Sequence, residues 1–134
     1  MSPWLNTHAV DDKLTSWLRH ALDRHPGLQI VIGYGIERDT GRVTKKDADQ
    51  REALRRLNDL GQQKRGRLRT HEVGNTHQKL VICDRRYAIV TSFNWLSFNP
   101  RPSRGVRMET GYRVETPADV AHLRAALAVA LRLR

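Results

Sequence analysis

The sequence predicts an α/β domain in which a mixed β-sheet is flanked by helices on both faces. Segments with helical and with strand patterns follow one another in the order α-β-α-β-β-β-β-α, which is typical of a layered domain. The 134 residues, of which 39% are hydrophobic and 28% charged, suffice for one domain with its own core, residues 1–134. No apolar run approaches the about 18 residues of a membrane span, so we expect no integral membrane association.

The first helix is predicted from apolar residues at helical spacing: Leu14, Trp17, Leu18, Ala21 and Leu22. Asp11 or Asp12 can cap its start, and Pro26-Gly27 ends it. The apolar run at residues 28–32 then predicts a short buried strand, which opens into a loop at residues 33–35.

A second helix follows a polar stretch at residues 37–47, which predicts a surface loop. The apolar side of this helix consists of Ala53, Leu54, Leu57 and Leu60. Gly61 stands where the residue after a helix is commonly glycine, so we expect the helix to end there.

Strand patterns dominate the next part of the chain. Residues 68–73 predict one short strand and residues 111–114 another. Between them lie two β-rich runs, residues 77–83 and 87–94. The intervening turn at residues 84–86 makes them an antiparallel hairpin.

The last helix has a clear N-terminal signal. Thr116 is placed as N-cap, Pro117 at the first helical position, and Asp119 three residues after the cap. Its apolar stripe consists of Val120, Leu123, Leu127, Ala130 and Leu131.

Positive charge is concentrated in the second half of the chain. The whole chain carries 24 Lys and Arg against 14 Asp and Glu, a formal charge of +10. Residues 64–134 contain 14 of these basic side chains and only 5 acidic ones. This excess indicates a polyanionic partner, either nucleic acid or an anionic membrane surface, although a solvated basic face is the simpler alternative.

The single cysteine, Cys83, excludes an internal disulfide and a cysteine-based zinc cluster. A reducing cytoplasm is therefore the expected compartment.

Four polar side chains are spaced so that the hairpin can bring them together. Residues i and i+2 of a strand share a face, so His77 and Lys79 project together, as do Ser92 and Asn94. If the two strands are neighbours, a nucleophile, a fixed positive charge and two neutral hydrogen-bonding groups meet at one end of the hairpin. Such a set suits the transition state of phosphodiester cleavage.

The spacing of these residues resembles the HxKxxxxDxxxxxxGSxN signature of the phospholipase D superfamily. Here the signature is formed by His77, Lys79, Asp84, Thr91, Ser92 and Asn94, with Thr91 in place of the usual glycine. Downstream, Glu109 lies in a segment similar to the family's N-x-E-x-G strand. The resemblance covers about residues 11–131 and implies a phospholipase D-like half-domain.

Only one His-x-Lys pair occurs in the chain. In this respect it resembles the small bacterial endonucleases of the family, which complete the site by forming a homodimer. We therefore expect a homodimer here.

The resemblance implies a role for each signature residue. His77 would attack phosphorus and form a phosphohistidine, while the partner subunit's His77 would protonate the leaving oxygen. Lys79 would hold the phosphate oxygens together with Ser92 and Asn94. Glu109 would fix the ring tautomer of His77. The mechanism requires no metal and no cofactor.

Asp84, the acid of the signature, begins the predicted turn. Seven residues of extended strand span roughly 23 Å, so we interpret Asp84 as structural.

Basic residues on either side of the signature are candidates for holding nucleic acid: Arg101, Arg104 and Arg107 before Glu109, and Lys64, Arg65, Arg67 and Arg69 in a basic connector. Together they would track a phosphate backbone near the site.

Three functions remain open from the sequence. The first is a metal-independent nuclease, an EC 3.1 hydrolase acting on DNA or RNA. The second is a phospholipase or phosphatidyl transferase on lipid. The third is a non-catalytic DNA-binding module of a larger DNA-processing polypeptide.

Overall fold

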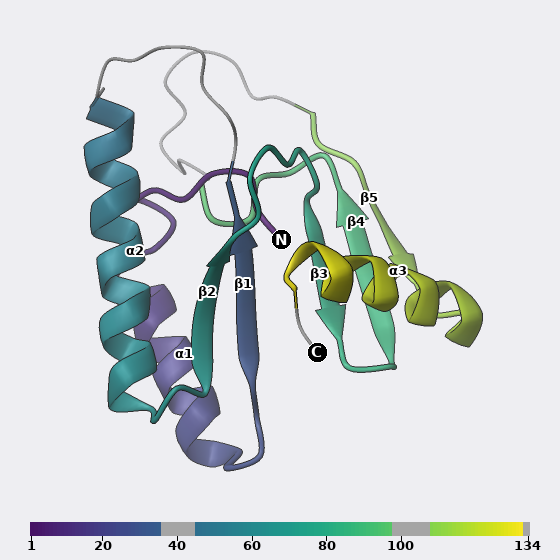
Figure 1. The fold of residues 1–134 in the computed structure, drawn as a ribbon, viewed down its shortest axis with the longest axis horizontal. Helices are drawn as coiled ribbons and strands as arrows, with labels where there is room; N and C mark the ends of the chain where they lie inside the picture. Colours follow the sequence, from purple (N-terminus) through teal and green to yellow (C-terminus); the bar gives the residue numbers. More distant parts are fainter. Residues whose placement is uncertain (36–44, 98–107, 133–134) are drawn as a thin grey trace.

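The computed structural model describes residues 1–35, 45–97 and 108–132 (Figure 1). Its elements follow the predicted order: α1 (Asp12–Arg24), β1 (Ile30–Tyr34), α2 (Lys45–Gln63), β2 (Leu68–Glu72), β3 (Leu80–Cys83), β4 (Tyr87–Thr91), β5 (Gly111–Val114) and α3 (Pro117–Ala130). The α/β class is therefore confirmed.

The strands form two small sheets instead of the single mixed sheet predicted. β1 and β2 are parallel, in register from Ile30–Leu68 to Tyr34–Glu72. β3, β4 and β5 form an antiparallel sheet with β4 in the centre. A parallel pair needs a crossover connection, and α2 lies in the connection from β1 to β2.

Residues 1–3 lie between the two sheets, which the sequence did not indicate. The Ser2 N–H donates to the carbonyl of Gly33 at 3.0 Å, and Ser2 bridges Tyr34 in parallel. On the other side, the Leu80 N–H donates to the carbonyl of Met1 at 3.2 Å. The backbone pairing of this segment with both sheets explains why the sheets lie side by side. The segment has no strand-like sequence pattern, so the sequence did not predict this pairing.

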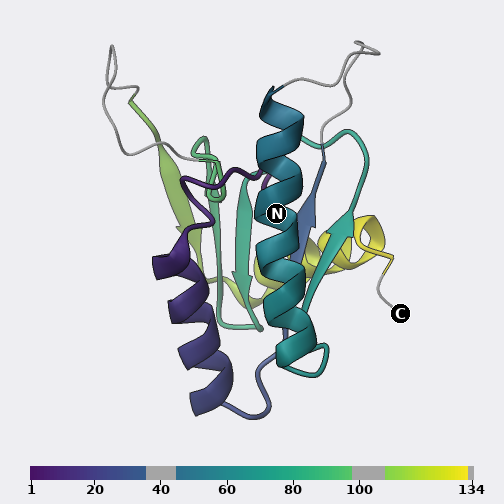
Figure 2. The ribbon, with the colours of Figure 1, turned by 90° about the vertical axis from the view of Figure 1, so that its left-hand side faces the viewer.

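Helices cover both sides of β1. Ile32 packs into a core with residues of α1 and α2, whereas a Cβ on the next residue, Gly33, would lie only 2.7 Å from the Leu131 side chain beyond α3. Successive strand residues face opposite sides, so α3 lies across the sheet from α1 and α2. In Figure 1, α3 crosses in front of β3 and β4, and Figure 2 shows the strands behind α1 and α2.

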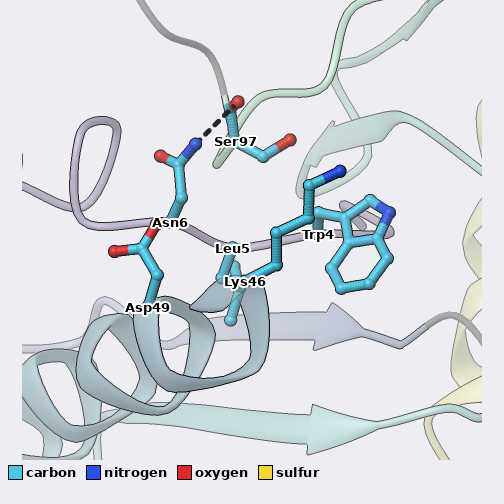
Figure 3. A pocket seen from close by; sticks show the side chains of 6 residues that line it. All are labelled: Trp4, Leu5, Asn6, Lys46, Asp49 and Ser97. Atoms are coloured by element: carbon cyan, nitrogen blue, oxygen red, sulfur yellow. Dashed lines mark hydrogen bonds between the residues drawn. The ribbon is translucent and has the colours of Figure 1, made fainter. Parts of the chain in front are cut away.

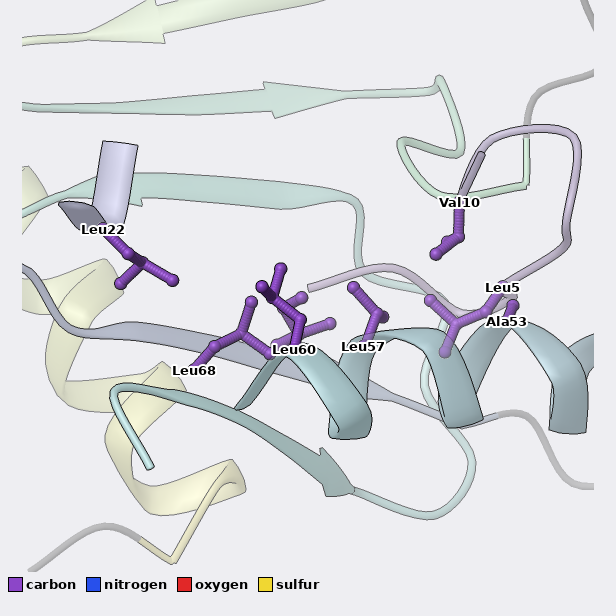
Figure 4. Packing of buried hydrophobic residues seen from close by; sticks show 8 residues of the cluster. Leu5, Val10, Leu22, Ala53, Leu57, Leu60 and Leu68 are labelled. Carbon is purple, nitrogen blue, oxygen red and sulfur yellow. The ribbon is translucent and has the colours of Figure 1, made fainter. Parts of the chain in front are cut away.

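The main core lies between α1, α2 and the parallel strands (Figure 4). It consists of Leu5, Val10, Leu22, Ile32, Ala53, Leu57, Leu60 and Leu68. The predicted apolar side of α2 is therefore confirmed. The prediction for Trp17 is wrong: it is 61% exposed, with the Lys13 ammonium 4.9 Å from its ring centre. Leu5 and Val10, from the segment before α1, complete the core instead.

Gly61 does not end α2, which continues to Gln63. A Cβ at Gly61 would lie 2.4 Å from the carbonyl oxygen of Leu68, so close approach to β2 explains the glycine. The chain reverses afterwards, at Arg65 and Gly66, whose φ angles are 54° and 74°. At the start of α1, the predicted cap is confirmed: the Asp11 carboxylate accepts from the Leu14 N–H at 2.8 Å.

None of the helices in the described ranges is long and apolar enough to cross a membrane.

Candidate active site at one edge of the antiparallel sheet

The start of β3, the end of β4 and the start of β5 lie at the same edge of the antiparallel sheet. Neighbouring strands run in opposite directions, so these three ends must coincide. The Thr91 N–H donates to the carbonyl of Lys79 at 3.1 Å, and the Ser92 N–H donates to the carbonyl of Thr110 at 2.9 Å. Backbone pairing therefore places the segments that carry His77, Ser92 and Glu109 next to one another.

The strand predicted at residues 77–83 begins later than expected. His77 and Lys79 therefore precede β3 instead of lying within it. The Lys79 Nζ lies 3.5 Å from the His77 Nδ1, at the outer limit of a hydrogen bond. An ammonium group can only donate, so Nδ1 is the acceptor in this arrangement. A neutral imidazole held in this way carries its proton on Nε2. His77 itself is exposed.

Ser92 and Glu109 form the best-connected pair of the site. The Ser92 hydroxyl donates to Glu109 Oε2 and accepts from the Thr110 N–H at 3.0 Å. The hydroxyl thus donates one hydrogen bond and accepts one across the β4–β5 boundary. Glu109 contacts Ser92 in this structure, so its expected role toward the ring of His77 stays a prediction.

Asn94 lies beyond the end of β4, where the alternation of the strand no longer applies. Its side-chain oxygen is buried and has no hydrogen-bond partner within the described ranges. Thr91, which stands where the signature has glycine, accepts from the Phe93 N–H through its own hydroxyl at 2.9 Å. The threonine therefore shapes the turn that leads from Ser92 to Asn94.

Asp84 lies at the opposite end of β3, as predicted. It is exposed, begins the turn to β4 and has a φ of 52°. The turn closes through the Arg86 N–H, which donates to the carbonyl of Cys83 at 3.0 Å.

The basic connector does not flank His77. Lys64 to Arg67 join α2 to β2, and Arg69 is the second residue of β2, at the end of the strands opposite the site (Figure 1). The Lys64 ammonium pairs with Asp23 at 2.6 Å, and Arg67 Nη1 donates to the carbonyl of Leu22 at 2.7 Å. Arg65 and Arg69 are exposed. Arg101, Arg104 and Arg107 lie outside the described residues.

A cavity of about 200 Å³ lies beside the segment that follows Asn94 (Figure 3). It is lined by Trp4, Leu5, Asn6, Lys46, Asp49 and Ser97. Asn6 joins its two sides, because its side-chain amide donates to the carbonyl of Ser97 at 2.9 Å. These residues come from three distant segments with no shared motif, so no pattern in the sequence indicates this cavity.

Within the described ranges, no group of three or more His, Cys, Asp or Glu side chains could hold a metal ion. Comparison of the chain with protein-family models, with curated proteins and with solved structures finds no match.

Proposed function

We propose that this chain is a metal-independent phosphodiesterase of the phospholipase D type, and specifically a nuclease that acts on DNA in a reducing cytoplasm. The proposal rests on one observation: the segments that carry the signature residues other than Asp84 lie together in the structure. His77, Lys79 and Ser92 follow the family spacing, and backbone pairing brings their segments and that of Glu109 to one sheet edge.

The proposed reaction has two displacement steps. A nitrogen of His77 attacks phosphorus and forms a P–N bond, while the P–O bond to the leaving group breaks. The partner subunit's His77 gives its proton to the leaving oxygen. Water then attacks phosphorus with loss of a proton to that same imidazole, and the P–N bond breaks.

Phosphate binding would rearrange the pair formed by His77 and Lys79. Lys79 would turn from Nδ1 to a non-bridging oxygen, where its charge stabilises the transition state. Nδ1 would then take up the ring proton and leave Nε2 free to attack. Glu109, already held by Ser92, would then accept a hydrogen bond from Nδ1.

The site described here belongs to one subunit and contains one His-x-Lys pair. A second copy would supply the second imidazole and the second ammonium. Activity per subunit should therefore fall as the protein is diluted below the dissociation constant of the dimer.

The experiment is a paired substrate assay with EDTA present. Labelled DNA and phosphatidylcholine are each given to wild type, to His77→Ala and to a matched control. The control is His122→Ala, a change at an exposed position on α3. We expect wild type and His122→Ala to cut DNA and His77→Ala to be inactive. Cleavage of phosphatidylcholine alone would make the protein a phospholipase. DNA binding without any cleavage would make it a binding module.

A further inference from the structure

We infer that the end of the molecule opposite the candidate active site binds a nucleic-acid backbone as a surface of its own. Three segments lie there: residues 23–29, from the last turn of α1 to the start of β1, residues 64–67 between α2 and β2, and residues 84–86 between β3 and β4. Both views show them at one end (Figures 1 and 2). We call these three segments the basic loop end.

The basic loop end carries six Lys and Arg side chains against two Asp side chains. Two of the basic groups serve the fold. Lys64 pairs with Asp23, and this hydrogen bond lowers the pKa of Asp23, which therefore keeps its charge. Arg67 donates hydrogen bonds to carbonyl oxygens at the C-terminal end of α1, where a cation interacts favourably with the helix dipole.

Four arginines are left over once these contacts are made. They are Arg24, Arg65, Arg85 and Arg86, all exposed. None of them forms an ion pair with a residue in the described part of the chain. Four guanidinium groups without ion pairs leave this end positively charged, and a phosphate backbone would neutralise that charge.

The shape of this end suits an anion. A hollow of about 550 Å³ lies between the first two segments. Its lining consists of Asp23, Pro26, Gln63, Lys64, Arg65 and Arg67. Because Lys64 already pairs with Asp23 and Arg67 donates to backbone carbonyls, Arg65 is the remaining basic group in this hollow that can take a phosphate oxygen pair in forked geometry.

An anionic membrane is the less suitable partner. The large hydrophobic side chains that are exposed in the described ranges are Trp17, Val81, Val90, Met108, Tyr112 and Val129, and none lies in the basic loop end. Surfaces that settle on lipid combine basic side chains with apolar ones that enter the bilayer. A purely charged, arginine-rich surface fits a nucleic-acid backbone.

The test measures binding to a DNA duplex in a His77→Ala background, so that turnover plays no part. The test variant carries Arg65→Asn, Arg85→Gln and Arg86→Gln. Asparagine is chosen at position 65 because it tolerates the positive φ of 54° found there. The control carries Arg19→Gln, Arg51→Gln and Arg124→Gln, which remove three exposed charges from the helices.

We expect the test variant to bind the duplex about tenfold more weakly than the control, with a salt slope less steep by about 2 to 3. Equal affinity and equal slope in the two variants would overturn the inference. Weaker binding to phosphatidylglycerol vesicles with unchanged duplex binding would also overturn it.

The inference stands apart from the proposed chemistry. In the background with His77 intact, the three loop substitutions should leave turnover of bis(p-nitrophenyl) phosphate unchanged. A matching loss of this turnover would show that the surface is not separate from the site. If the protein cleaves no diester at all, the proposed function fails while the binding result still stands.

Discussion

The two ends of the molecule differ in how their polar side chains are held. At the candidate active site, Ser92, Glu109 and Thr110 are joined by hydrogen bonds across neighbouring strands. At the basic loop end, Arg24, Arg65, Arg85 and Arg86 are exposed without ion pairs in the described ranges. Side chains held in a fixed geometry are suited to catalysis, whereas basic side chains without ion pairs are suited to binding phosphates. The proposed chemistry and the proposed binding are therefore assigned to opposite ends of the strands.

The largest effect that separates the two ends is expected from His77→Ala. Loss of the nucleophile should lower diester turnover at least about 10³-fold, while duplex binding through the basic loop end changes less than about twofold. Turnover is measured on labelled DNA and binding by fluorescence anisotropy. If the variant still cuts DNA at the wild-type rate, His77 is not the nucleophile and the assignment of catalysis to this end is wrong.

A smaller loss of activity is expected from Ser92→Ala. The variant removes the group that holds Glu109 and leaves the Thr110 N–H without its acceptor, so kcat should fall about 10- to 100-fold. Ser16→Ala, at an exposed position of α1, is the matched control. If Ser92→Ala retains full kcat, the pair of Ser92 and Glu109 takes no part in the reaction.

Gly61→Ala tests the packing that places the α2–β2 connection at the basic loop end. The added methyl group would press on the carbonyl of Leu68, so we expect a loss of about 1–3 kcal/mol in unfolding free energy. Chemical denaturation measures it. Gly27→Ala is the control, because a Cβ there meets nothing within 4 Å. Equal stability of the two variants would contradict the close approach of α2 and β2.

Within the basic loop end, substitution of Arg67 should lower stability, whereas substitution of Arg65 should lower duplex affinity. Arg67→Gln removes the donor to the carbonyls at the end of α1 and should cost about 1 kcal/mol of stability with little change in duplex affinity. Arg65→Asn should weaken duplex binding and leave stability unchanged. Thermal unfolding and anisotropy of both variants test the distinction, and the opposite pattern would exchange their roles.

The smallest effect concerns α2, which runs between the two ends (Figure 1). Hydrogen bonds from Arg55 and Arg56 lower the pKa of Glu52 from 4.5 to about 2. A carboxyl with a lowered folded-state pKa stabilises the fold above the unfolded value. Its contribution is therefore present above about pH 4.5 and is lost as the pH falls toward 2. Glu52→Gln should flatten the decline of stability over this interval, and an unchanged decline would show that these contacts are too exposed to matter.

Local patterns predicted the order of the elements well. The apolar side of α2, the Asp11 cap and the turn at Asp84 each depend on residues close together in the sequence, and the structure confirms all three. For the same reason, the hairpin geometry that brings residues 79 and 91 together could be inferred from spacing alone.

Features that depend on distant contacts escaped the sequence. Residues 1–3 join the two sheets through backbone hydrogen bonds, which leave no side-chain pattern. Gly61 was interpreted by a local rule for helix ends, whereas its contact is with Leu68. The location of the basic connector likewise depends on which ends of the strands meet, and a one-dimensional count of charge cannot show this.

The proposed mechanism requires that His77 becomes covalently bound to phosphorus during cleavage. The most direct measurement is mass spectrometry of the protein after rapid alkaline quenching of the reaction with a DNA oligonucleotide, because P–N bonds to histidine survive base and are lost in acid. We expect a nucleotide adduct on the peptide that contains His77 in wild type and in His122→Ala, and none in His77→Ala. DNA cleavage at an undiminished rate with no adduct on His77 at any time point would contradict it.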